Sequence, residues 1–178
     1  VRQRLGGLAG ADNGHELSRA GHVHRVRGDH GAARGLPGSV ERLDEVVEHL
    51  RNAVAEGRQA YWVCPLVEES EVVDLTAAEE RFRVLRAALG DGVVGLVHGQ
   101  MPPAEKDAAM AAFVAGRTQV LVATTVIEVG VNVPNASIMV VERAEIFGLA
   151  QLHQLRGRVG RGAAESTCLL MYQPPLSE

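Results

Sequence analysis

The sequence has almost no lysine, few cysteines and no long apolar run. Lys106 is the only lysine among 18 basic residues, a bias that points to a GC-rich genome rather than to chemistry. No stretch approaches the roughly 18 consecutive apolar residues of a membrane-spanning helix, and no apolar leader is visible, so we expect neither membrane insertion nor secretion. Cys64 and Cys168 lie far apart without metal-ligand spacing around them, which predicts buried free thiols in a reducing compartment.

The net charge of −4 conceals an uneven distribution. Residues 1–38 carry six arginines against three acidic residues, whereas residues 39–178 carry 19 acidic residues against 12 basic ones. The acidic excess of the larger part argues against a generic polyanion-binding surface. Any contact with nucleic acid therefore has to be local.

Residues 1–38 also differ in pattern from the rest. They hold nine of the 20 glycines and four of the seven histidines, and their apolar residues follow no helical or strand period. We interpret them as a flexible or non-native arm before a folded domain of residues 39–178. The alternatives are a basic nucleic-acid-binding arm and a histidine metal site, and the latter lacks a carboxylate or thiolate framework.

From residue 39 onward, short apolar runs alternate with segments of helical period. Helices are expected from Ser39 to about residue 56, over 75–89, from Pro102 to Gly116, and in the arginine-rich segment near residue 155. Strands are expected at 59–64, 93–99, 119–123, 137–142 and 167–172. This alternation is typical of an α/β domain whose mainly parallel sheet is covered by helices on both faces.

Ligands of such sheets bind beyond the carboxyl ends of the strands. Three segments leave expected strand ends: HGQM at 98–101, TTVIEVGVNVP at 124–134, and the path from Glu142 to the arginines. Thr125 and Glu128 have capping-box spacing, so local structure alone could account for them. Exposed N–H groups and threonine hydroxyls at a helix start could equally bind phosphate, and His98 could be structural or part of a site.

The segment QLHQLRGRVGRG, residues 151–162, crowds arginines onto a stretch that glycine weakens as a helix. On a helical wheel, one polar stripe contains Gln151, Gln154, Arg158 and Arg161, and a neighbouring apolar stripe contains Leu152, Leu155 and Val159. Two forked guanidiniums on one face suit binding of a polyphosphate or a transferring phosphoryl group. The glycines allow a ligand to approach the backbone closely. The alternative is a solvated face, or pairing of the arginines with Glu142 and Glu145.

These pieces together resemble a known family. LVATTVIEVGVNVP, followed after 16 residues by QLHQLRGRVGRG, resembles motifs V and VI of superfamily 2 helicases. The fuller set, with QAYWVCPLVEESE, GLVHGQM and PAEKDAAM, is similar to RecG-type ATP-dependent DNA helicases over roughly residues 40–178. Mfd-type transcription-repair coupling translocases share motif VI, while VATTVIEVGVNVPNAS favours the RecG type.

The resemblance implies a RecA-like fold and a division of roles. ATP would sit between two RecA-like domains, with Mg²⁺ held by the first domain rather than by this chain. The implied catalytic residues are Arg158, Arg161 and Gln154, the first two as arginine fingers. The implied nucleotide-binding residues are Gly130 and Asn132, and the implied DNA-binding residues are Thr124, Thr125 and His98. Many family members have aspartate where this chain has Asn132.

Two family motifs are missing. The sequence contains neither G-x-x-x-x-G-K-[ST] nor a DExH-type acidic motif after a strand. The resemblance thus implies a fragment, the second RecA-like domain of a bacterial cytoplasmic helicase that remodels branched DNA and stalled replication forks. Its partners would be ATP, branched or duplex DNA, and the first RecA-like and wedge domains of the same parent chain. We expect the fragment alone to be inactive. The rivals are an Mfd-type translocase domain and a non-catalytic nucleotide- or DNA-binding module.

Overall fold

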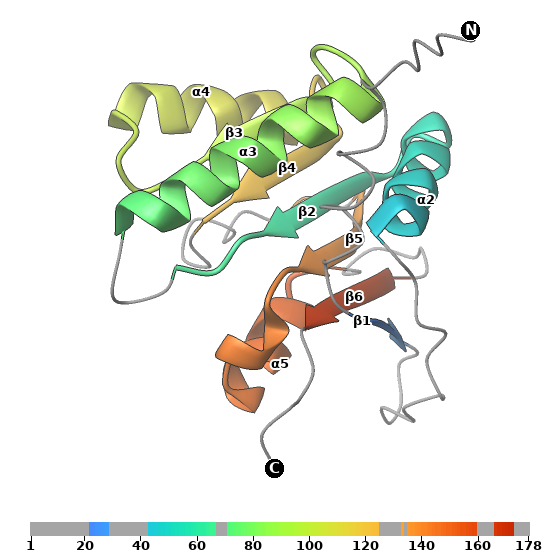
Figure 1. Ribbon diagram of the computed structural model, residues 1–178. Coiled ribbons are helices and arrows are strands. Elements are labelled where there is room, and N and C mark those ends of the chain that lie inside the picture. Colours follow the sequence, from blue (N-terminus) through green and yellow to red (C-terminus); the bar gives the residue numbers. More distant parts are fainter. Residues whose placement is uncertain are drawn as a thin grey trace, which may run out of the picture.

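A six-stranded sheet in the order β1-β6-β5-β2-β4-β3 forms the centre of the protein (Figure 1). The computed structural model describes residues 22–28, 43–66, 71–124, 133, 135–159 and 166–172. In chain order the elements are β1 (His22–Gly28), α2 (Leu43–Ala55), β2 (Gln59–Val63), α3 (Glu71–Leu89), β3 (Val94–Val97), α4 (Pro103–Val114), β4 (Val120–Ala123), β5 (Ala136–Val141), the 3₁₀ turn η2 (Ala144–Ile146), α5 (Leu149–Arg156) and β6 (Ser166–Tyr172).

The five strands expected from the sequence are all present, and they pair in parallel. β2 lies between β4 and β5, β3 flanks β4, and β6 flanks β5. All residues of β2, β4 and β5 are buried, as expected for strands covered on both faces. The predicted α/β class with a mainly parallel sheet is confirmed.

The sixth strand, β1, lies in the segment for which no regular element was expected. It pairs antiparallel with β6, from His22 opposite Tyr172 to Gly28 opposite Ser166. Its sequence, HVHRVRG, places two valines three positions apart and so lacks the period of two that marks a strand. Pairing with an available sheet edge therefore decides its structure. The division between residues 38 and 39 stays a prediction.

Successive side chains of the strands enter opposite layers of the core. Trp62 of β2 belongs to the cluster formed with α2 and α3, which includes Leu50 and Leu85. Tyr61 belongs to the cluster formed with α4 and α5, which includes Phe113. The expected coverage of both sheet faces is thus confirmed, and β2 anchors both layers.

The ends of α2 and α4 follow the sequence signals closely, whereas α3 begins at Glu71, four residues before its expected start. α4 has Pro103 as its first residue, where the missing N–H costs nothing. The glycines predicted to end α2 and α4, Gly57 and Gly116, have φ angles of 80° and 75°, which a side chain would disfavour. The start of α2 is described from Leu43, and the expected cap Ser39 lies outside the described residues.

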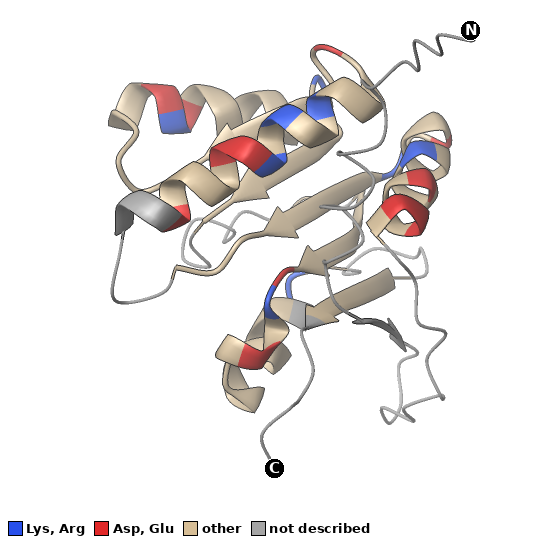
Figure 2. Ribbon diagram, viewed as in Figure 1, with Lys and Arg blue, Asp and Glu red and all other residues tan. Residues whose placement is uncertain are grey.

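Acidic and basic positions are interspersed along α2, α3 and α4 (Figure 2). Cys64 and Cys168 are buried free thiols, as predicted. Burial, reinforced by the nearby negative charge of Glu142, raises the pKa of Cys64 well above its usual value, which keeps this thiol protonated. None of the described helices is both long and apolar enough to cross a membrane.

Candidate nucleic-acid and nucleotide site

The carboxyl ends of the parallel strands meet at one edge of the sheet, and hydrogen bonds continue beyond them. Three such bonds join Glu142 N–H to the Val63 carbonyl (2.9 Å), Cys64 N–H to the Ala123 carbonyl (2.8 Å), and Thr124 N–H to the Val97 carbonyl (3.2 Å). The residues that follow β5, β2 and β4, together with the last residue of β3, therefore form a row across this edge. The predicted site residue Thr124 belongs to this row, and a second one, His98, directly follows Val97 at its end.

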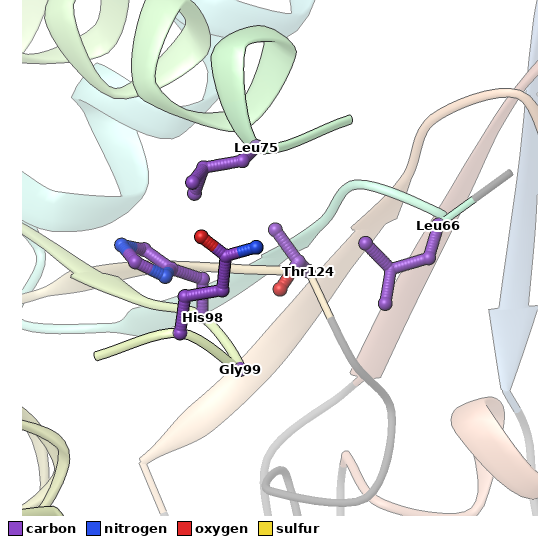
Figure 3. A pocket seen from close by; sticks show the side chains of 6 residues that line it. Leu66, Leu75, His98, Gly99 and Thr124 are labelled. Atoms are coloured by element: carbon purple, nitrogen blue, oxygen red, sulfur yellow. The ribbon is translucent and has the colours of Figure 1, made fainter. Parts of the chain in front are cut away.

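A pocket of about 230 Å³ opens at this edge. It is lined by Leu66, Leu75, His98, Gly99, Gln100 and Thr124. Figure 3 shows Thr124 between His98 and Leu66, with Leu75 reaching in from the start of α3. The structure thus brings together two predicted DNA-binding residues from separate segments of the chain.

Two polar atoms in this pocket lack hydrogen-bond partners among the described residues. They are Nδ1 of His98 and the Oγ1 hydroxyl of Thr124, and both are buried. A buried polar atom without a partner costs free energy, so such atoms usually have water or a ligand as partner. The hydroxyl of Thr118 is also buried and unpartnered within the described part of the chain, but it precedes β4 and does not line the pocket.

The arginine segment departs from the predicted continuous helix. α5 ends at Arg156, and Gly157 is its C-cap with φ −66° and ψ −6°. The N–H of Arg158 bonds to the carbonyl of Leu155 at 3.0 Å, a 3₁₀-type turn beyond the helix. The prediction of one helix through residue 161 was wrong because glycine, a poor helix former, ends it first.

The predicted apolar stripe is nevertheless buried. Leu155 and Val159 are 0% and 6% exposed, and Leu152 packs against the same cluster. Arg158, between them in the chain, is half-buried, whereas Gln154 is exposed. The side chain of Gln151 accepts a hydrogen bond from the Gly148 N–H at 3.1 Å, so it caps the start of α5.

Arg158 lies close enough to Tyr61 to affect its ionisation. Burial raises the pKa of Tyr61 to about 12, and the positive charge of Arg158 acts in the opposite direction. Tyr61 therefore stays neutral at physiological pH. The predicted alternative partner Glu142 has another role, since its carboxylate accepts hydrogen bonds from Trp62 and Arg81.

Several predicted residues fall outside the described part of the chain. They are Thr125, Gly130, Asn132 and Arg161, together with the proposed capping-box residue Glu128. The sequence reasoning missed Leu66 and Leu75, which supply the apolar walls of the pocket. Their only signal was position, since Leu66 follows an expected strand and Leu75 begins an expected helix. Within the described ranges, no group of three His, Cys, Asp or Glu side chains could hold a metal ion.

Comparison with known protein families identifies the family of the chain. Residues 40–163 match the family described as "Helicase conserved C-terminal domain". The chain belongs to this helicase C-terminal domain family. The expected resemblance to RecG-type helicases is confirmed as well, by relatives with more than half of their aligned residues identical.

Curated relatives named "ATP-dependent DNA helicase RecG" align with three quarters of the chain. The protein of Acidithiobacillus ferridurans is 59% identical over 136 residues, 76% of this chain and 20% of its own length. That of Escherichia coli K12 is 58% identical over 138 residues, 77% of this chain and 20% of its own length. The chain spans about a fifth of the length of these relatives.

Solved structures agree with the family assignment. A structure described as RecG bound to a three-way DNA junction matches 80% of this chain and 20% of its own, with a TM-score of 0.62 and 42% identity. The DUF1998 helicase MrfA bound to DNA matches 74% of this chain and 17% of its own, with a TM-score of 0.57. At 18% identity the second match supports the helicase C-terminal domain fold alone.

Proposed function

We propose that this chain is the second RecA-like domain of a RecG-type ATP-dependent DNA helicase, which remodels branched DNA and stalled replication forks in bacterial cytoplasm. Residues 39–178 form the domain in this proposal, in keeping with the family match from residue 40. The observation that carries the proposal is that His98 and Thr124 line one pocket and each has, within the ranges that the structure describes, an unpartnered buried polar atom, in a chain so similar to RecG. The RecG structure with a three-way DNA junction supports DNA as the ligand in this proposal.

In this proposal the pocket receives the DNA backbone. A phosphate oxygen would accept a hydrogen bond from the Thr124 hydroxyl, and the Nδ1 of His98 would meet a second group of the backbone or its bound water. Thr125 belongs to the same set. Since phosphate contacts position a duplex without reading its sequence, this assignment suits an enzyme that acts on DNA shape.

The arginine segment serves ATP in this proposal. Arg158 and Arg161 act as arginine fingers, Gln154 couples nucleotide to DNA, and Gly130 and Asn132 face the nucleotide. The half-buried Arg158, held between Leu155 and Val159, is consistent with a guanidinium of restricted motion. Mg²⁺ would be held by the first RecA-like domain, which would also supply the phosphate-binding loop that this sequence lacks. The wedge domain would engage the DNA branch.

A matched pair of threonine variants tests the pocket. In the full-length protein, Thr124→Val is expected to weaken binding of branched DNA about 10-fold, because it removes a hydrogen bond to a charged phosphate. Thr118→Val removes the equivalent buried, unpartnered hydroxyl at the other end of β4 and should leave affinity unchanged. Fluorescence anisotropy with a labelled three-way junction measures both. Equal affinities for the two variants would contradict the role of the pocket.

The isolated chain provides a second test. We expect it to release no phosphate from ATP above background, with or without DNA, because it contains no phosphate-binding loop sequence. A phosphate-release assay beside the full-length protein supplies the comparison. Sustained turnover by the purified chain would mean that it completes an ATP site by itself, contrary to the proposal.

A further inference from the structure

Glu142, the first residue after β5, joins three elements through its side chain. Its carboxylate accepts hydrogen bonds from the indole Nε1 of Trp62 on β2 and from the guanidinium of Arg81 on α3. The second guanidinium contact, from a terminal nitrogen of Arg81, is 3.3 Å long. Trp62, Arg81 and Glu142 thus form one polar cluster, called here the Glu142 cluster.

The Glu142 cluster differs from the other ion pairs of α3 in its burial. The side chains of Arg81 and Glu142 are 16% and 18% exposed, whereas those of Arg86 and Asp91 are 52% and 83% exposed. The guanidinium carbon of Arg81 also lies 5.5 Å from the centre of the Trp62 ring, within cation–π range. Exposed ion pairs contribute little to folding stability. A partly buried ion pair with two contacts and an additional indole donor restricts the orientation of its side chains.

The Glu142 cluster is connected through the chain to both parts of the proposed site. On one side, Arg81 belongs to α3, and Leu75 of the same helix lines the pocket with His98 and Thr124. On the other side, Glu142 begins the path to Arg158. The next residue, Arg143, adopts a left-handed conformation with φ 49° and ψ 49°, and η2 and α5 follow.

The chain turns sharply at Arg143, which has a positive φ angle. A non-glycine residue at positive φ is strained and persists only where its surroundings hold it. The preceding residue, Glu142, is restrained by its backbone hydrogen bond to Val63 and by its two side-chain partners. The residue that precedes this corner is therefore the one whose carboxylate also bonds to α3.

We propose that Glu142 is a positioning residue that links the pocket wall to the arginine segment, so that DNA in the pocket promotes productive placement of Arg158. This inference rests on the proposed function. Glu142 touches neither nucleotide nor DNA in this account, and it acts through Arg81 and through the corner at Arg143. Its loss should therefore reduce the stimulation of ATP turnover by DNA rather than binding itself.

The test uses the full-length helicase that contains this chain. Glu142→Gln keeps the size of the side chain and removes its charge. We expect ATP turnover at saturating DNA to fall about 10-fold, the effect of one charge-assisted hydrogen bond. Turnover without DNA, the KM for ATP and the affinity for a three-way junction should each stay within about 2-fold of wild type. Arg81→Gln should reproduce this pattern.

Two further variants keep the test decisive. Arg86→Gln makes the same change on the same helix but breaks only the exposed pair with Asp91, so DNA stimulation should be unchanged. Trp62→Phe removes the indole donor while keeping a ring, and should lower stimulation about 3-fold even where Glu142→Gln fails to fold. A thermal unfolding curve for each variant identifies those that fold.

The possible outcomes distinguish a failure of this inference from a failure of the proposed function. Full stimulation by DNA in folded Glu142→Gln and Arg81→Gln proteins would overturn the inference. A uniform loss of turnover with and without DNA would also overturn it, because that result indicates a general structural role. Failure of the proposed function would appear elsewhere, as wild-type turnover in an Arg158→Ala protein.

Discussion

Replacing Arg158 with alanine in the full-length protein is expected to lower ATP turnover by about 10³-fold or more. The guanidinium would stabilise negative charge that develops as the γ-phosphoryl group is transferred, and arginine fingers contribute about 10³–10⁵ in rate. Binding of branched DNA should stay within about 2-fold of wild type, because the DNA pocket is formed by other residues. Phosphate release and fluorescence anisotropy measure the two effects on one preparation.

The surroundings of Arg158 sharpen this expectation. Leu155 and Val159, which flank Arg158 in the sequence, are buried through their own side chains. Removing the guanidinium therefore leaves these apolar contacts of the core in place, and Tyr61 stays neutral. Arg158→Lys keeps the charge without the planar fork and should recover only part of the activity. Arg83→Ala, which removes an exposed arginine of α3, is the control and should leave turnover unchanged. Turnover of Arg158→Ala within a few-fold of wild type would remove the arginine-finger assignment.

The largest expected effect on stability comes from Phe113→Ala. Phe113 is fully buried, and its ring centre lies 4.9 Å from that of Tyr61 in a tilted arrangement. It is the one fully buried side chain described in α4, whose Ala109 and Met110 pack against the same cluster only partly buried. Truncating a buried phenylalanine costs about 3–5 kcal/mol of folding free energy. Urea denaturation of the purified protein gives the value.

The adjacent residue supplies a control for this variant. Val114 is 48% exposed, so Val114→Ala should change the free energy of unfolding by no more than about 0.5 kcal/mol. The carbonyl of Phe113 also accepts a 2.6 Å hydrogen bond from the buried side chain of Gln59. That bond uses only the backbone of residue 113, so alanine retains it. A loss below about 1 kcal/mol would show that α4 is attached by other contacts.

The strands were predictable because burial on both faces leaves a continuous apolar run. QAYWV and VLVA carry this signal in their own residues, and each was recognised. The strand His22–Gly28 carries no such signal, because its structure depends on pairing with β6, almost 150 positions later. Local sequence cannot report a partner so distant, which is why this edge strand was missed.

The same distinction applies to the candidate site. His98 and Thr124 were predictable because each follows a strand, and parallel pairing brings strand ends to one edge. Arg158 was assigned to a helix that glycine ends two residues earlier, although the burial of Leu155 and Val159 was predicted correctly. The pairing of Glu142 with Arg81 required knowledge of where α3 lies relative to the end of β5, which no local pattern supplies.

The central position of β2 has a consequence for biosynthesis. Its residues pair with β4 and β5, so that Ala60 lies beside Val120 and Ile138. At roughly 5–20 residues per second on the ribosome, the nascent β2 strand waits about 3–12 seconds for its first neighbour. During that time the uncharged and mostly apolar strand QAYWV has no sheet partner, and β4 must then insert between β2 and β3, which are both made before it. Pairing of β2 and β3 into the sheet therefore cannot begin until the chain has been translated as far as Ala123, the last residue of β4.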